Sequence, residues 1–188
     1  MANYLKPETL AQLDEYRRKI FALRQEAYQL TNIDVLDNDT LSALSIYEIV
    51  RQYDPDYNIN FARNGEDAKS LGVDIEMKAS RIERKKRSGV YGLAGFQFHA
   101  MGNIEYDRYI LVTRDKATLA LIRIYDIAGA ENCLQIQAHL LAEREAWLAR
   151  GRKDQAKMKH DVIQLPEALL QTFAATSSTI DGVEVVRA

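Results

Sequence analysis

Charged side chains alternate with apolar ones in the segment NGEDAKSLGVDIEMKAS, residues 64–80. The apolar or small residues at every second position are Val73, Ile75, Met77 and Ala79. This alternation predicts a half-buried strand over residues 73–80, whose other face carries Asp74, Glu76 and Lys78 together. Such a face is either simply exposed to water or arranged to hold a doubly positive ion.

The spacing of three of these side chains suits metal-assisted phosphoryl chemistry. Glu76 and Lys78 project to the same side of a strand because they are two residues apart. Asp67 lies nine residues before Glu76, which suits two neighbouring strands joined by a turn at Gly72. Two carboxylates with carbonyl and water oxygens suit Mg²⁺, which stabilises charge on a phosphoryl oxygen and activates a bound water. The alternative is a solvated face with a local Glu76–Lys78 ion pair.

The surrounding patterns predict the elements that would position these residues. Apolar residues at helical spacing predict helices over 7–30, over 132–150, and after Asp39 as an N-cap. Strands are expected at 59–63, 73–80, 108–113, 118–127 and 161–165, with Pro166 opening a short last helix. The dense apolar runs 108–113 and 118–127 indicate a hairpin covered on both faces. The fold class is therefore mixed α/β, with a central sheet of about five strands flanked by helices.

Composition is that of a globular protein of 188 residues, expected to form one domain, with 47% hydrophobic and 28% charged residues. No apolar run approaches the roughly 20 residues that span a bilayer, and no basic-then-apolar secretory pattern opens the sequence. The single cysteine, Cys133, excludes an internal disulfide and a multi-cysteine zinc site. We therefore expect a cytoplasmic protein with no membrane partner.

Asp67, Glu76 and Lys78 resemble the D-x(n)-(D/E)-x-K signature of the PD-(D/E)xK nuclease superfamily. The chain is similar in particular to type II restriction endonucleases. Three segments carry this resemblance in order over the C-terminal two-thirds: RNGEDA…VDIEMKAS, FQFHAMGN with the apolar hairpin after it, and GRKDQAKMKHDVIQL. It implies a restriction-endonuclease-like fold and a homodimer that cuts both strands of DNA with Mg²⁺, leaving 5′-phosphate and 3′-hydroxyl ends. A cognate DNA methyltransferase is the implied functional companion.

The resemblance also assigns roles to the residues of the first segment. Asp67 and Glu76 match the metal-binding carboxylates, the Met77 carbonyl matches a further ligand, and Lys78 matches the catalytic lysine. Outer-shell or second-metal candidates are Glu66 and Asp74. A rival first carboxylate is Asp56 in the literal Pro55-Asp56, twenty residues before Glu76. Asp67 is preferred because its NGEDA context matches the restriction-enzyme pattern and its spacing needs only a tight turn.

Net charge is only −2, but two segments concentrate positive charge that DNA phosphates would attract. The candidate phosphate contacts in the first are Arg81, Arg84, Lys85, Lys86 and Arg87. The second, which resembles a segment entering the major groove, carries Arg152, Lys153 and Lys157. Gln97 suits adenine and His99 suits guanine in the major groove. The alternatives are two solvated loops and, for His99, a histidine that is satisfied in the core or simply exposed on the surface. Ala156-Lys157 stands where related enzymes often carry Asn-Asn, so the base preference does not transfer.

The expected function is therefore a type II restriction endonuclease that cuts double-stranded DNA at a short site. Residues 1–53 would form a helical dimer contact, and residues 54–188 would form the catalytic and DNA-recognition core of one domain, 1–188. Two alternatives stay open: a structure-specific nuclease of the junction-resolvase or repair type, and a non-catalytic DNA-binding module of the same fold.

Overall fold

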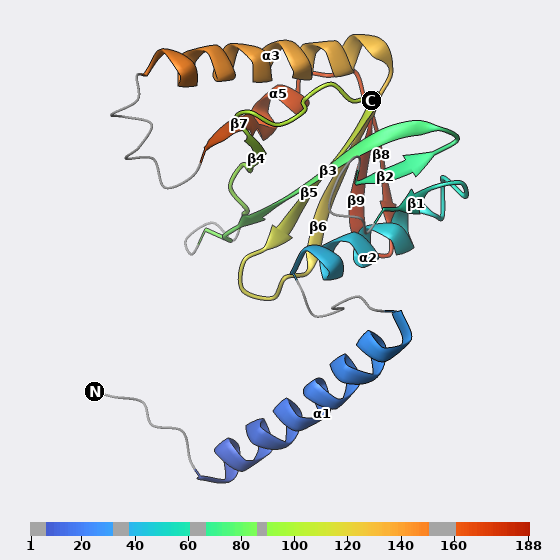
Figure 1. Cartoon of the computed structure of the whole chain (residues 1–188), viewed down its shortest axis with the longest axis vertical. Helices are drawn as coiled ribbons and strands as arrows, with labels where there is room; N and C mark the ends of the chain where they lie inside the picture. The colour runs from blue at the N-terminus through green and yellow to red at the C-terminus, as the bar shows by residue number, and fades with distance from the viewer. Residues whose placement is uncertain (1–6, 32–37, 61–66, 86–89, 151–160) are drawn as a thin grey trace. The chain divides into compact units, whose positions relative to one another are not determined.

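A computed structural model describes residues 7–31, 38–60, 67–85, 90–150 and 161–188 (Figure 1). Contacts between Cα atoms divide the chain into two compact units, Met1–Leu44 and Ser45–Ala188. None of the helices within these ranges is long and apolar enough to cross a membrane.

The N-terminal unit contains the long helix α1, Pro7–Thr31, as the apolar spacing predicts. Pro7 suits the first turn of a helix, where its missing N–H leaves no hydrogen bond unmade. The next helix, α2, spans Asn38–Val50 and crosses the boundary between the two units. It begins at Asn38, so Asp39 lies inside the helix rather than before it as an N-cap. The sequence Asp37-Asn38-Asp39-Thr40 contains only residue types that cap helices well, so composition alone could not choose among these four positions.

Within the described part of the second unit, seven strands form one mixed sheet in the order β1-β2-β3-β5-β6-β9-β8. Their bounds are β1 Asn58–Ile59, β2 Ala68–Ser70, β3 Val73–Ile82, β5 Arg108–Asp115, β6 Leu121–Ala128, β8 Thr176–Ile180 and β9 Val183–Arg187. The pairs β3–β5 and β6–β9 are parallel, and the other neighbours are antiparallel. The predicted mixed α/β class is confirmed, and so is the hairpin of β5 and β6.

The sheet has more strands than the five expected from the sequence, although the predicted strand 161–165 lies outside it. It also contains β2, the short neighbour that the Asp67–Glu76 spacing implied, and the C-terminal hairpin of β8 and β9, which was not predicted. Strand β8 reads TSSTI and is mostly exposed, so it lacks the apolar alternation that marks a strand. The turn between them, Asp181-Gly182, has positive φ at both residues, 49° and 80°. Asp-Gly is a strong signal for a tight hairpin turn, and here it precedes the alternating VEVVR of β9.

A separate two-stranded antiparallel ribbon is formed by β4, Gly95–His99, and β7, Val162–Pro166. The strand predicted at 161–165 is therefore confirmed, but it pairs with β4 instead of joining the large sheet. The short helix α5, Glu167–Leu170, follows with Pro166 as its N-cap. Helix α3, Ala130–Ala149, agrees with the predicted 132–150 to within two residues.

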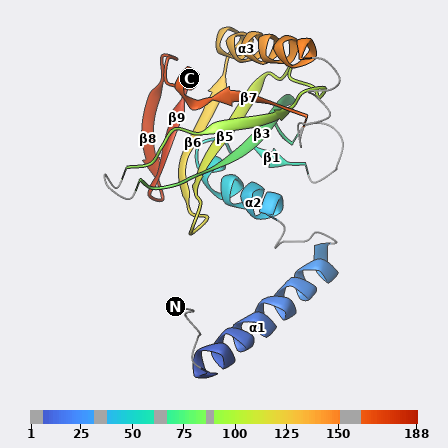
Figure 2. The ribbon, with the colours of Figure 1, turned by 90° about the vertical axis from the view of Figure 1, so that its left-hand side faces the viewer.

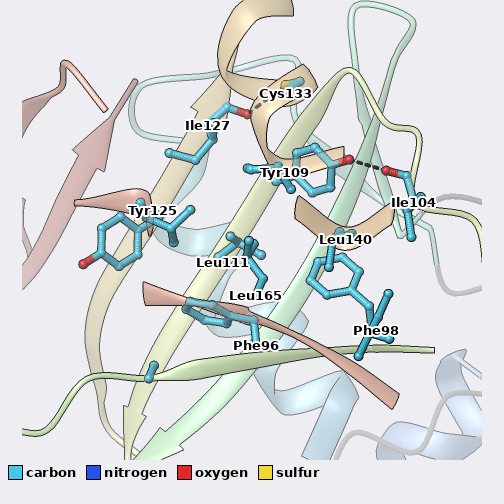
Figure 3. Packing of buried hydrophobic residues seen from close by; sticks show 14 of the residues in the cluster. Phe96, Phe98, Ile104, Tyr109, Leu111, Tyr125, Ile127, Cys133, Leu140 and Leu165 are labelled. Carbon is cyan, nitrogen blue, oxygen red and sulfur yellow. Dashed lines mark hydrogen bonds between the residues drawn. The ribbon is translucent and has the colours of Figure 1, made fainter. Parts of the chain in front are cut away.

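Successive residues of β5 and β6 point to opposite sides of the large sheet, and both of its faces are covered. One face packs against α3 and the ribbon, and the other packs against residues 45–50 of α2 (Figure 2). Figure 3 shows the first of these clusters, where side chains from β4, β5, β7 and α3 meet, including Phe96, Phe98, Leu111, Leu140 and Leu165. The second cluster contains Ile75, Ile110, Val112, Ile124 and Val185. The prediction of strands buried on both faces is confirmed.

Candidate active site

The β2–β3 hairpin brings Asp67 next to the middle of β3. Ala68 pairs with Ile75, and the Asp67 N–H donates to the Ile75 carbonyl over 3.1 Å. Leu71 and Gly72 form the turn with φ of 49° and 84°, the left-handed conformation that tight two-residue hairpins use. Asp67 and Glu76 thus come from neighbouring segments joined by a turn, as their spacing suggested.

The short length of β2 gives Asp67 its particular contact with β3. Strand pairing ends at Ala68, so the next N–H of β3 that faces this edge has no strand partner on β2. The Met77 N–H donates instead to Asp67 Oδ2 over 2.9 Å. The Asp67 carboxylate is thereby held in place by a backbone group of the strand that carries Glu76.

Three oxygens converge on the ammonium of Lys78. Its Nζ lies 3.1 Å from the Met77 carbonyl oxygen and 3.4 Å from Asp67 Oδ2, and it forms an ion pair with Glu76 Oε1. Glu76 and Lys78 share one face of β3, as their spacing predicts. The structure therefore brings Asp67, Glu76, Met77 and Lys78 together at one point.

Glu76 is buried in this cluster, with only 6% of its surface exposed. Burial raises the pKa of the Glu76 carboxyl, because a charged group loses hydration there, and the Asp67 charge raises it further. The Lys78 ammonium lowers the pKa of Glu76, as does a hydrogen bond from Tyr106, but the net direction is upward. A doubly charged cation would offset both the desolvation and the repulsion between the carboxylates.

Tyr106 is a member of the site that the sequence analysis missed. Its hydroxyl donates a hydrogen bond to Glu76 and accepts one from Asn103. Burial and the Glu76 charge raise the pKa of Tyr106, so its hydroxyl keeps its proton and stays a donor. Tyr106 precedes β5, the parallel neighbour of β3, and no local sequence pattern reveals which strands are neighbours.

The apolar surroundings hold β3 in place behind the site. The Tyr57 hydroxyl lies 2.7 Å from the Met77 sulfur on the opposite face of the sheet. On the site's own face, the Phe98 ring centroid is 5.6 Å from Lys78 Nζ. Such a cation–π contact favours the charged ammonium and restricts where it can move.

The oxygens at this site fit a small hard cation. Across the described residues, no group of three or more His, Cys, Asp or Glu side chains could hold a metal. Asp67 and Glu76 supply two carboxylates, and the Met77 carbonyl supplies a third protein oxygen, a set that suits Mg²⁺ with its retained waters. The Lys78 ammonium shows that these oxygens can converge on one positive centre.

Two of the other acidic candidates, Asp74 and Asp56, lie apart from this cluster. Asp74 pairs across the hairpin with Lys69 at 3.4 Å, with about half of each side chain exposed. No hydrogen bond or ion pair within the described residues joins the rival Asp56 to Glu76 or Lys78. The Asp56 N–H instead donates to Asp54. Glu66 lies outside the described residues.

The predicted DNA contacts are only partly described. The exposed residues Arg81, Arg84 and Lys85 end β3 or follow it, and Arg84 forms a β-bridge with Tyr91. On the ribbon, Gln97 and His99 are exposed, whereas Phe96 and Phe98 are buried. The residues outside the described ranges are Lys86, Arg87, Arg152, Lys153 and Lys157.

The ribbon adds one polar side chain that the sequence analysis did not single out. Gln164 of β7 pairs directly with Gln97 of β4, and both residues are exposed. Finding Gln164 needed the pairing of two strands that are more than sixty residues apart in the chain.

No family model and no curated protein matches this chain.

Proposed function

We propose that the chain is a type II restriction endonuclease of the PD-(D/E)xK superfamily, which uses Mg²⁺ to hydrolyse phosphodiester bonds in double-stranded DNA. It would cut at a short specific sequence and leave 5′-phosphate and 3′-hydroxyl ends. The observation that carries this proposal is the convergence of Asp67, Glu76 and the Met77 carbonyl on one positive centre. Two carboxylates that can hold Mg²⁺ beside a lysine suit the hydrolysis of a phosphodiester bond.

The metal would be held by the oxygens of Asp67, Glu76 and Met77. The chemistry that Mg²⁺ supplies when bound is stabilisation of charge on a phosphoryl oxygen and a lower pKa for a bound water. The buried Glu76 supports this assignment, because a bound cation would offset the desolvation and the Asp67 charge that together raise the pKa of its carboxyl.

The chain's own groups would position the reactants. Lys78 carries three N–H donors and would orient the attacking water or neutralise charge that develops on the phosphate. Phe98 lies against Lys78 and would restrict the ammonium to the side of the cluster where the phosphate binds. Tyr106 holds the Glu76 carboxylate by a hydrogen bond, which fixes where its oxygens point.

DNA recognition would fall to the ribbon and the basic residues near the end of β3. A two-stranded ribbon fits the major groove, where glutamine bonds to adenine through two hydrogen bonds. Gln97 and His99 lie on the exposed face of β4, whose buried residue Phe98 contacts Lys78. Phosphate contacts would come from Arg81, Arg84 and Lys85, with Lys86, Arg87, Arg152, Lys153 and Lys157 as further candidates.

The proposed enzyme acts as a homodimer, with one site for each DNA strand, in the cytoplasm beside a cognate DNA methyltransferase. A twofold-symmetric dimer matches a duplex whose two strands carry the same site.

Cleavage of plasmid DNA tests the proposal. With Mg²⁺ we expect discrete fragments whose ends share one sequence, and with EDTA we expect none. Lys78→Ala should lower the cleavage rate by at least about a hundredfold, because it removes the ammonium that orients the attacking water or neutralises charge on the phosphate. Lys69→Ala is the matched control, since Lys69 is exposed on the same hairpin and pairs with Asp74 outside the cluster. Equal cleavage by the two variants would contradict the assignment.

A branched DNA junction separates the proposal from a structure-specific nuclease. Cutting confined to the branch, with intact plasmid, would replace site-specific restriction by recognition of DNA shape. Binding of DNA without any Mg²⁺-dependent cleavage would leave only a DNA-binding module.

A further inference from the structure

Helix α1 carries a continuous apolar seam in a heptad pattern. Spacings of three and four residues alternate along it, and its members, here called the α1 seam, are Leu13, Tyr16, Ile20, Leu23, Ala27 and Leu30. The five large residues are each 50–80% exposed. An alternation of three and four keeps residues on one stripe of a helix, which is the pattern of a coiled-coil interface.

We propose that the α1 seam pairs with the α1 seam of a second copy of this chain in an antiparallel two-stranded coiled coil. A second copy presents the same heptad spacing over the same length, so all six positions of each helix meet a seam residue. Covering these side chains removes their apolar surface from water.

Side-chain volumes favour the antiparallel orientation. In a parallel pair each seam residue meets its own copy, so Tyr16 would meet Tyr16 and Ala27 would meet Ala27. One layer would then be crowded and another would leave a cavity. In the antiparallel pair Tyr16 lies opposite Ala27 of the second copy, so that the largest seam residue meets the smallest. The remaining layers join Leu13 to Leu30 and Ile20 to Leu23.

Charges beside the seam favour the same orientation. An antiparallel pair places Lys19 opposite Glu26 of the second copy, and symmetry makes this ion pair twice. A parallel pair would place Lys19 opposite Arg24, which repels it twice. The antiparallel pair also brings Arg17 near Arg24, but Asp14 Oδ1 already binds the Arg17 guanidinium at 2.7 and 2.9 Å.

The pairing depends on α1 alone and does not require nuclease activity. Only its consequence for catalysis rests on the proposed function, since the dimer would supply two sites to one duplex. Oligomeric state measured without DNA therefore tests the seam, whereas cleavage tests the nuclease, and either can fail without the other.

Sedimentation equilibrium of the full chain over a concentration series tests the seam. We expect a monomer–dimer equilibrium, and Leu23→Asp should raise the dimer dissociation constant at least about tenfold. Phe21→Asp is the matched control, because Phe21 is 53% exposed but lies off the seam on the same helix. Circular dichroism of both variants checks that they keep their helices, which we expect because neither substitution introduces proline or glycine. A wild-type chain that stays monomeric, or equal effects of the two variants, would overturn the proposal.

Charge exchange tests the orientation. Lys19→Glu and Glu26→Lys should each weaken the dimer about threefold to tenfold, because each places like charges opposite one another. A mixture of the two variants should form a mixed dimer as tight as the wild type, with both ion pairs restored. Lys19→Glu also removes a 2.7 Å ion pair with Glu15 in the same helix. This loss occurs in the Lys19→Glu chain whether it is measured alone or in the mixture, so it cannot account for tighter binding in the mixture.

A parallel coiled coil gives the opposite result for one variant. In the parallel pair, Lys19→Glu would place a carboxylate opposite Arg24 of the second copy and lower the dimer dissociation constant. Tightening by Lys19→Glu, or a mixture no tighter than the single variants, would overturn the antiparallel arrangement.

Discussion

Glu76 is a buried carboxylate that contacts an ammonium on one side and a phenol on the other. Its negative charge costs hydration, and each contact reduces that cost. Lys78 supplies positive charge, whereas Tyr106 supplies only a hydrogen bond. The two contacts therefore have different consequences when they are removed.

Tyr106→Phe should weaken Mg²⁺ binding without unfolding the protein. The variant keeps the ring, which packs edge-on against Tyr109 with centroids 6.0 Å apart, but loses the hydroxyl that orients Glu76. We expect the Mg²⁺ concentration for half-maximal cleavage to rise about tenfold. Calorimetric titration of Mg²⁺ provides a readout that does not depend on turnover.

The control for Tyr106→Phe is Tyr91→Phe, which removes a hydroxyl that donates to Asp115 over 2.8 Å. This variant should leave the Mg²⁺ requirement unchanged. An unchanged requirement in Tyr106→Phe as well would mean that the hydroxyl does not position the Glu76 carboxylate.

Arg108 contributes to stability on the other face of the sheet. Its guanidinium forms ion pairs with Asp54 at 2.5 Å and Asp126 at 2.6 Å, and all three side chains are at most 15% exposed. Arg108→Ala would leave the buried carboxylates of Asp54 and Asp126 without the guanidinium that neutralises them. We expect the free energy of unfolding, measured with urea, to fall by about 3–5 kcal/mol.

An exposed ion pair on the same molecule supplies the comparison. Lys116 pairs with Glu83 at 2.5 Å, but their side chains are 61% and 70% exposed. Lys116→Ala should therefore change the free energy of unfolding by less than about 1 kcal/mol. Similar losses in both variants would show that burial does not set the strength of the Arg108 network.

At the scale of elements, the β2–β3 hairpin determines whether Asp67 reaches β3. Its turn needs left-handed backbone at Leu71 and Gly72, and only glycine adopts that conformation without steric cost. Because β2 is three residues long, Met77 presents its N–H and carbonyl to the candidate site rather than to a neighbouring strand.

Gly72→Ala should destabilise this hairpin through its backbone alone. Gly72 has φ +84°, and an added Cβ meets no atom within 4 Å, so the cost is conformational and not steric crowding by neighbours. We expect a loss of about 1–2 kcal/mol in the free energy of unfolding.

Gly92→Ala is the matched control, because its added Cβ also meets nothing and its φ is not in the left-handed region. Stability there should be unchanged or raised by up to about 1 kcal/mol. If Gly72→Ala cost no more than Gly92→Ala, the turn would tolerate another conformation.

At the scale of the whole molecule, the proposed homodimer with two sites predicts how a plasmid is cut. Wild-type dimers should convert a supercoiled plasmid to the linear form at its site. A mixed dimer of wild-type and Lys78→Ala chains, purified through two different tags, has one intact site and should produce nicked circles. Agarose gels distinguish these products.

The mixed dimer of wild-type and Lys69→Ala chains should still produce linear plasmid, since Lys69 pairs with Asp74 away from the cluster. Linear product from the Lys78→Ala mixed dimer would mean that one site cuts both strands in turn. The prediction of one site for each strand would then be wrong.

The sequence by itself determined the parts of the site that lie close together in the chain. Alternation placed Glu76 and Lys78 on one face of a strand, and a short connection with Gly72 placed Asp67 beside them. Helical spacing predicted α1 and α3 within two residues of their observed ends. These are local properties, because the spacing of apolar residues and the residue types that form tight turns each involve only a few neighbouring positions.

Only the tertiary structure decided which distant segments became neighbours. Tyr106 reaches Glu76 because β5 lies parallel to β3, and Gln164 lies beside Gln97 because β7 leaves the large sheet to pair with β4. The polar strand β8 gains its place by pairing with β9 at the sheet edge. Such pairings depend on how both faces of the sheet are covered, and that burial is a property of the whole packed chain rather than of any one segment.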